Sequence, residues 1–85
     1  MTGSDIRKRV PPEARIIGSN MKRLRRYAGL TQAEAGKRLN VTFQQIQKYE
    51  SGQNRLPSEK LYLLRQLYRT SYEEFFKGLE EFYRR

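Results

Sequence analysis

The stretch LTQAEAGKRLNVTFQQIQKYESG, residues 30–52, carries the signals that decide the fold. Thr31 and Glu34 have the spacing of a capping box, in which each side chain pairs with the other residue's backbone amide at a helix start. Asn40 stands where this helix should stop, because Asn tolerates the left-handed backbone that such a turn needs. Thr42 is a suitable cap for a second helix. The stretch therefore predicts two short helices joined by a tight turn.

The first of these helices has small residues on its expected inward face. Ala33, Gly36 and Leu39 recur at about helical spacing. A glycine inside a helix costs about 1 kcal/mol relative to alanine, so close packing is a plausible reason for Gly36. Together with Ala35, it predicts that another helix crosses here at short distance.

The second helix carries a row of amide side chains. Ile46 and Tyr49 lie three residues apart and predict its inward face. The outward face then carries Phe43, Gln44, Gln47 and Lys48. Glutamines alone would suit a merely solvated surface, but an outward phenylalanine among them favours a recognition surface.

These residues resemble the helix-turn-helix of the lambdoid phage repressor and Cro family, the Xre-like DNA-binding domains. The matching features are Leu30-Thr31-Gln32, Gly36, Leu39, the turn at Asn40, Val41 and Thr42, then Ile46 and Tyr49-Glu50-x-Gly52. Two positions depart from the family pattern. Ala35 stands where the family usually has Leu, which leaves a smaller core that something else must fill, and Asn40 stands where it usually has Gly.

The resemblance implies an all-α fold, a compact five-helix bundle around a central helix-turn-helix. It also implies that the helix 42–50 lies in the major groove of DNA with its N-terminal half toward the base edges. Phe43 would contact a thymine methyl group, Gln44 an adenine, and Lys48 a guanine or a phosphate. The expected base contacts are Phe43, Gln44, Gln47 and Lys48. The expected phosphate contacts are Gln32, Thr42, Gln45, Asn54 and Arg55.

Arg25 and Glu50 have a different expected role. In the family, the arginine that matches Arg25 pairs with the glutamate that matches Glu50. This pair ties the first helix to the end of the recognition helix. We therefore expect Arg25 and Glu50 to form a structural ion pair rather than to contact DNA directly.

The residues before the motif predict an arm and a helix. Residues 1–11 are expected to form a flexible basic arm, which either contacts DNA through Arg7, Lys8 and Arg9 or serves as a solubilising tail. Pro12 suits a first helical position, and Gly29 suits a stop, so a helix is predicted from about Pro12 to Ala28. Its buried stripe is predicted to be Ile17, Met21, Leu24 and Ala28.

The residues after the motif predict two more helices. Ser58 is expected to cap a fourth helix with an apolar face, and Ser71 to open a fifth with a capping box. The helical domain is expected to span residues 12–78, with 79–85 as a tail that packs on a partner or frays. Exposed aromatic patches tend to be interaction sites, so a dimer contact is expected here. Its residues are Phe75, Phe76, Leu79, Phe82 and Tyr83.

The composition excludes several classes of function. The chain has 85 residues, no cysteine and no histidine, so thiol chemistry and the commonest metal ligand and general base are missing. We expect no metal, no cofactor and no enzyme activity. No apolar run is long enough to span a membrane and no signal peptide is evident, so the chain is expected to be soluble and cytoplasmic.

The positive charge points to a polyanion. The net charge is +9, and residues 1–28 carry eight Lys/Arg against Asp5 and Glu13. The residues beyond Pro57 are nearly balanced, with six bases against five Glu. The polyanion should therefore meet the first two thirds of the chain.

The sequence predicts a sequence-specific regulator, most simply a repressor, that binds a pseudo-palindromic double-stranded DNA site as a homodimer. An antitoxin that binds its own promoter and a toxin, a restriction-modification controller and an RNA-binding or coactivator-like protein remain open. A protein partner such as a toxin or polymerase is possible, whereas an enzyme and a membrane-bound helix are the weakest alternatives.

Overall fold

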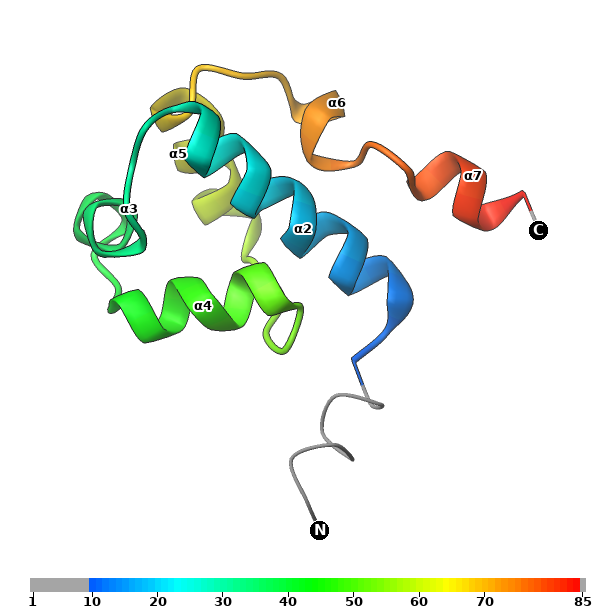
Figure 1. Cartoon of the computed structure of the whole chain (residues 1–85), viewed down its shortest axis with the longest axis horizontal. Coiled ribbons are helices and arrows are strands. Elements are labelled where there is room, and N and C mark those ends of the chain that lie inside the picture. The colour runs from blue at the N-terminus through cyan, green and yellow to red at the C-terminus, as the bar shows by residue number, and fades with distance from the viewer. Residues whose placement is uncertain (1–9, 85) are drawn as a thin grey trace, which may run out of the picture.

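Six helices and the turns between them make up residues 10–84, the part of the chain that the computed structural model describes (Figure 1). No strand occurs in this part. In chain order the helices are α2 (Pro12–Tyr27), α3 (Gln32–Leu39), α4 (Phe43–Ser51), α5 (Ser58–Leu67), α6 (Tyr72–Phe75) and α7 (Leu79–Tyr83). The predicted all-α class is confirmed. The predicted fifth helix is the short α6, and a further helix, α7, forms in residues that were predicted to be a tail.

The break between α6 and α7 has a local cause. Gly78 has a φ of +97°, a left-handed conformation that ends α6 and its following turn before α7 starts. Ser71 opens α6 as its N-cap residue, as predicted, but the predicted capping box at Ser71 and the predicted cap at Ser58 are wrong. Neither Ser71 nor Ser58 makes a side-chain capping bond: Ser71 precedes α6 without one, and Ser58 is already inside α5 because Pro57 takes the capping position.

Helix α2 is the longest element and supports the others. Pro12 occupies its first turn as predicted, and Gly29 follows its end with a φ of +76°. Met21 and Leu24 are buried and Ile17 is half-buried, but Ala28 is exposed. The prediction for Ala28 is wrong because the helix ends one residue earlier. The remaining buried positions of α2 are Ala14, Gly18 and Arg25.

The core is built from residues before, within and after the helix-turn-helix. Ala35 and Phe75 are completely buried and belong to one apolar cluster with Met21, Leu39, Ile46 and Leu64. Phe75 thus supplies apolar volume to the core that contains the small Ala35, and its assignment to a dimer contact is wrong. Ala33 is exposed, so Ala35 rather than Ala33 faces inward.

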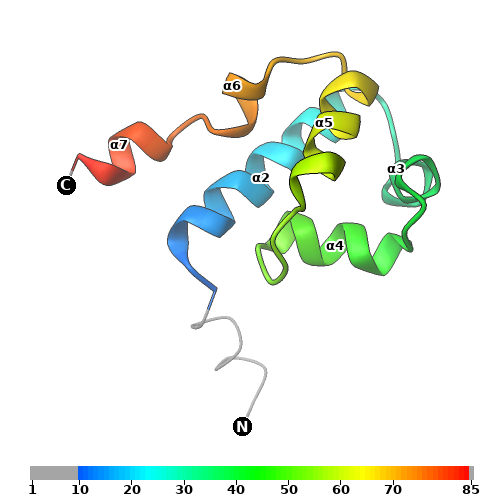
Figure 2. The ribbon, with the colours of Figure 1, turned by 180° about the vertical axis from the view of Figure 1, so that it is seen from behind.

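The C-terminal segment lies along α2, on a different side from α4 (Figures 1 and 2). The Asn20 side-chain amide donates to the carbonyl oxygens of Phe75 and Lys77, at 2.8 and 2.9 Å. The Tyr83 hydroxyl donates to Glu13 at 3.1 Å. Residues 79–83, predicted as part of a tail, therefore pack on α2 of their own chain.

Only the end of the predicted N-terminal arm falls within the described residues. Val10 is buried, and its side chain lies close to Gly52. Residues 1–9, including Arg7, Lys8 and Arg9, lie outside the described part, so the expected DNA contact of this arm stays a prediction.

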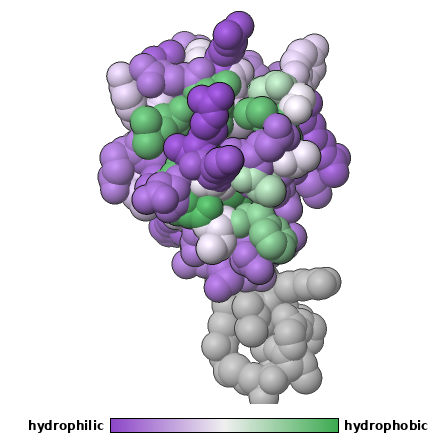
Figure 3. All heavy atoms as spheres, turned by 90° about the vertical axis from the view of Figure 1, so that its left-hand side faces the viewer, coloured by the Kyte–Doolittle hydropathy of each residue, from purple (hydrophilic) through white to green (hydrophobic). Residues whose placement is uncertain are grey.

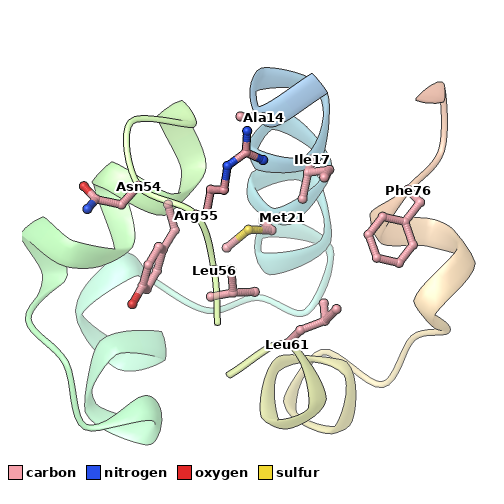
Figure 4. A pocket seen from close by; sticks show the side chains of 9 residues that line it. Ala14, Ile17, Met21, Asn54, Arg55, Leu56, Leu61 and Phe76 are labelled. Atoms are coloured by element: carbon pink, nitrogen blue, oxygen red, sulfur yellow. The ribbon is translucent and has the colours of Figure 1, made fainter. Parts of the chain in front are cut away.

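An apolar cavity of about 140 Å³ lies between α2, the loop 53–57, α5 and the end of α6 (Figure 4). Ile17 and Met21 face it from α2, Leu61 faces it from α5, and Phe76 lies across from them. Phe76 is 40% exposed, so this side of the domain presents apolar surface to solvent.

Candidate nucleic-acid interface

The turn between α3 and α4 is built as the sequence predicts. Thr31 and Glu34 form the capping box, with the Glu34 amide donating to the Thr31 hydroxyl and the Thr31 amide donating to the Glu34 carboxylate. These hydrogen bonds lower the pKa of Glu34. Asn40 ends α3 with a φ of +58°, and the Thr42 hydroxyl accepts from the Gln45 amide to cap α4. Both helix starts and the turn are therefore fixed by local hydrogen bonds.

Gly36 allows α3 to approach the start of α4. The Val41 amide donates to the Gly36 carbonyl oxygen at 2.9 Å, which folds the turn back on α3. A Cβ atom at Gly36 would lie 2.7 Å from the Val41 carbonyl oxygen. The predicted close approach at Gly36 is present, but it is made by the backbone of the turn 41–42 that leads into α4.

The two sides of α4 differ in burial. Ile46 and Tyr49 are buried, as predicted. The side chains on the opposite side are solvent-exposed: Phe43, Gln44, Gln47 and Lys48. Phe43 is 46% exposed, and Gln45 is half-buried at the edge of this face. The helix thus presents one aromatic ring, two amides and one ammonium group, and the two amides and the ammonium group have no hydrogen-bond or ion-pair partner within residues 10–84.

The loop after α4 continues the exposed surface. Gly52 has a φ of +83°, and the Asn54 amide donates to the Lys48 carbonyl oxygen at 3.2 Å. Ser51 and Gln53 line a shallow hollow together with three side chains of α4, namely Gln44, Gln47 and Lys48. Ser51 was not among the residues predicted for the interface, whereas Gln53 belongs to the loop 53–57 that the family resemblance places on the DNA backbone.

Arg55 is exposed at the tip of the same loop. Its guanidinium is directed toward the N-terminal half of α2 (Figure 4). Its charge also acts on Tyr83 of α7: the hydrogen bond to Glu13 raises the pKa of Tyr83, and the charge of Arg55 opposes this rise.

A buried ion pair fixes the far end of α4. The Arg25 Nε donates to the Glu50 carboxylate at 2.7 Å, and a second guanidinium nitrogen donates to the other carboxylate oxygen at 3.2 Å. The third nitrogen donates to the Leu30 carbonyl oxygen at 2.8 Å. The hydrogen bond with Glu50 raises the pKa of Arg25. Helix α2, the start of α3 and the end of α4 are held together at this point.

Gln32 also belongs to this network. Its amide nitrogen donates to Glu50 at 3.0 Å, and its side chain is half-buried. The side chain expected at a phosphate is therefore anchored by the ion pair. This leaves its amide oxygen and its backbone amide at the N-terminus of α3 for other partners.

Tyr68 lies near the ion pair and gives the first prediction. Its hydroxyl is buried and has no hydrogen-bond partner within residues 10–84. Burial, and then the charge of Glu50, raise its pKa well above the usual value of 10.0. The unfolded chain therefore loses this proton at lower pH than the folded chain, so the free energy of unfolding decreases as the pH rises above about 10.

We expect Tyr68→Phe to change the free energy of unfolding at pH 7 by less than about 1 kcal/mol, because no hydrogen bond is lost. Above pH 10 the variant should lose less stability than the parent. Urea titrations at pH 7 and at pH 10.5, with the exposed Tyr27→Phe as control, measure both effects. Equal alkaline loss in parent and variant would contradict the assignment.

Gly18 is a structural residue that the sequence analysis missed. A Cβ atom there would lie 2.7 Å from the Tyr49 carbonyl oxygen and even closer to that of Glu50. The same signal that identified Gly36, a glycine inside a predicted helix, was available for it. It allows α2 to touch the backbone at the end of α4.

Two further features bear on the kind of site. Among residues 10–84, none of the helices combines the length and the apolar character needed to cross a bilayer. The same part of the chain contains no cluster of side chains suited to hold a metal ion.

Known proteins share this motif. Residues 21–75 match the helix-turn-helix family. The chain is 38% identical over 61 residues to an uncharacterized HTH-type transcriptional regulator of Sinorhizobium medicae (strain WSM419), covering 72% of this chain and 44% of that protein. It is 36% identical over 64 residues to an uncharacterized transcriptional regulator in the ATPase CF(0) region of Rhodospirillum rubrum, covering 75% and 59%. The chain spans about half the length of the curated relatives it matches.

Proposed function

Because the chain belongs to the helix-turn-helix family, in the Xre-like or Cro/C1-type group of DNA-binding domains, we propose that it is a sequence-specific transcriptional regulator. It binds double-stranded DNA and most simply represses transcription. The observation that carries this proposal is the exposed polar face of α4, held outward by a buried opposite face and by the Arg25–Glu50 pair.

In this proposal, α4 lies in the major groove and its exposed side chains contact base edges. Gln44 pairs with an adenine through its amide, and Phe43 contacts a thymine methyl group. Gln47 and Lys48 lie one turn further along and contact bases or a nearby phosphate. Their positions on one exposed face support this arrangement, because one approach to the groove brings all four to the DNA.

The phosphate contacts lie on both sides of α4 in the chain. Gln32 and the N-terminus of α3 precede α4 in the chain, and Asn54 and Arg55 follow it in the loop 53–57. Thr42 and Gln45 stand at the start of α4, where the capped backbone is rigid. Contacts of this kind set the register of the protein on the duplex without reading its sequence.

The proposed regulator acts as a two-fold homodimer. The remaining candidates for the dimer contact are Phe76, Leu79, Phe82 and Tyr83. Phe76 is 40% and Tyr83 64% exposed, and Phe76 borders the open apolar cavity. A dimer would place two α4 helices about 34 Å apart, one turn of DNA. Analytical ultracentrifugation tests it, and a monomer at all concentrations with and without DNA would contradict it.

The second prediction concerns base reading. We expect Gln44→Ala to weaken binding to the selected site by about 1–3 kcal/mol, because one bidentate contact is lost. Binding to random duplexes should hardly change. Fluorescence competition titrations measure both affinities. Gln66→Ala, which removes another exposed amide on α5, serves as the control and should leave both affinities unchanged. Equal loss on both DNAs would refute the base contact.

The third prediction concerns phosphate binding. We expect Arg55→Gln to weaken binding to all sequences alike and to reduce the slope of log K against log salt by about one. Titrations at several salt concentrations measure this slope. The control Lys22→Gln removes one exposed charge from α2. A sequence-dependent loss, or a slope that changes equally in the control, would argue against a direct contact.

A second candidate function is an antitoxin, which binds both its promoter and a toxin protein. The exposed aromatic side chains Phe76 and Tyr83 favour a protein contact of some kind. Co-expression with the product of the adjacent gene tests this alternative. A stable complex that buries these residues would support the antitoxin over the simple repressor.

A further inference from the structure

A further concave surface lies apart from the exposed face of α4 and shares no lining residue with the hollow beside that helix. It is formed where the C-terminal ends of α2 and α5 meet α3 (Figure 1). We name it the α3–α5 hollow, and its main lining residues are Tyr27, Arg38, Leu63, Gln66, Leu67 and Arg69. Figure 3 views the molecule from the α3 side and shows hydrophobic side chains separated by hydrophilic ones.

The hollow combines apolar and basic side chains. Tyr27 is 89% and Leu63 41% exposed, which is much apolar surface to leave in water. Arg38 and Arg69 are also exposed, and neither makes an ion pair within residues 10–84. No carboxylate is among the residues that line the hollow. Glu74, which lines an adjoining depression with Tyr27 and Arg69, is paired with Arg23 at 3.2 Å. The hollow therefore carries uncompensated positive charge beside its leucines.

Arg69 gives an independent observation. Its φ is +51°, in the left-handed region that disfavours side chains other than those of Gly, Asn and Asp. It follows the end of α5, at the position where helices usually place glycine. The chain thus has an arginine where a glycine would be less strained. Strain of this kind tends to occur where a side chain has a binding role.

We propose that the α3–α5 hollow binds an acidic peptide segment of another protein, with an apolar side chain seated against Leu63 and Leu67. Carboxylates of the segment pair with Arg38 and Arg69, and Tyr27 covers its edge. Charge complementarity supports an acidic partner. A nucleic acid fits less well, because phosphate contacts gain nothing from leucines, and the C-terminal ends of α2 and α5 lie away from α4 (Figure 1).

The test uses three probes on the full chain. The first is a fluorescein-labelled 12-residue peptide of Asp, Glu, Leu and Phe, which would be about 18 Å long as a helix. The second has its Leu and Phe replaced by Ser, and the third is a random-sequence DNA duplex. Binding is followed by fluorescence anisotropy, and its location by backbone amide shifts in NMR spectra.

We expect the first peptide to bind at least about tenfold more tightly than the second, with shifts centred on residues 27–30, 38 and 63–69. Comparable binding of the two peptides would overturn the apolar part of the proposal. Larger shifts of these residues with the duplex would assign the hollow to nucleic acid instead. An absence of binding, or shifts confined to α4, would overturn the proposal entirely.

Two variants separate binding from folding. Arg69→Gly removes a charge and relieves the strained backbone, so it should melt at the same or a higher temperature and bind the first peptide about tenfold more weakly. Arg38→Glu should weaken binding of the first peptide by at least as much. Lys22→Glu changes an exposed charge outside the hollow and controls for net charge. If Lys22→Glu and Arg38→Glu lowered the affinity for the first peptide equally, the proposed site would be overturned.

Discussion

Replacing Arg25 with alanine is expected to lower the free energy of unfolding by about 3–5 kcal/mol, because the Glu50 carboxylate would then be buried without its partner. Both side chains are more than nine-tenths buried, and they share two hydrogen bonds. Glu50→Ala leaves the guanidinium unpaired and should cost a similar amount. For a domain of 85 residues this is a large share of the total stability. Urea unfolding followed by circular dichroism measures it.

The exposed pair Arg23–Glu74 is the matched control. Its atoms lie 3.2 Å apart, but both side chains are 41% exposed. Arg23→Ala should therefore cost no more than about 1 kcal/mol. The double variant Arg25→Met with Glu50→Leu should recover much of the stability, since no buried charge remains. Similar costs for Arg23→Ala and Arg25→Ala would contradict the central position given to the buried pair.

The second large effect is expected at Gly18. Gly18→Ala should lower the free energy of unfolding by about 1–3 kcal/mol, because the added methyl group meets the backbone carbonyls of Tyr49 and Glu50. Backbone atoms cannot rotate away as the end of a side chain can, so α2 and α4 must separate. DNA binding should weaken as well, since α4 is displaced from its support.

Ser19→Ala is the control for this substitution. Ser19 is the exposed neighbour in the same helix, and alanine there improves helix propensity by a few tenths of a kcal/mol, or about the same as the error of the measurement. Thermal unfolding of both variants gives the comparison. A Gly18→Ala protein as stable as Ser19→Ala would show that the two helices are less closely packed than described.

The sequence predicted the motif well because its signals are local. The capping box of Thr31 and Glu34, the left-handed Asn40 and the cap at Thr42 depend on residues at most a few positions apart. The inward and outward faces of α4 followed from helical spacing alone. The pairing of Arg25 with Glu50 was anticipated only through the family resemblance, since nothing local relates residues so far apart.

The C-terminal part was predicted less well because its contacts are long-range. Phe75 lies in a core shared with Met21 and Leu39, which no local pattern shows. The boundary at residue 78 was predicted, but the residues beyond it were expected to be a tail and instead form α7, which packs on α2. The strained Arg69 carries no sequence signal, because arginine is ordinary near a helix end.

The central claim is that the exposed face of α4 reads base pairs. Selection of binding sites from a random duplex pool, carried out side by side with the parent chain and Gln44→Ala, tests it most directly. The account predicts two half-sites about one helical turn apart. It also predicts that the variant loses preference at one symmetric position in each half-site. Identical preferences for both proteins, or no enriched sequence for the parent, would contradict it.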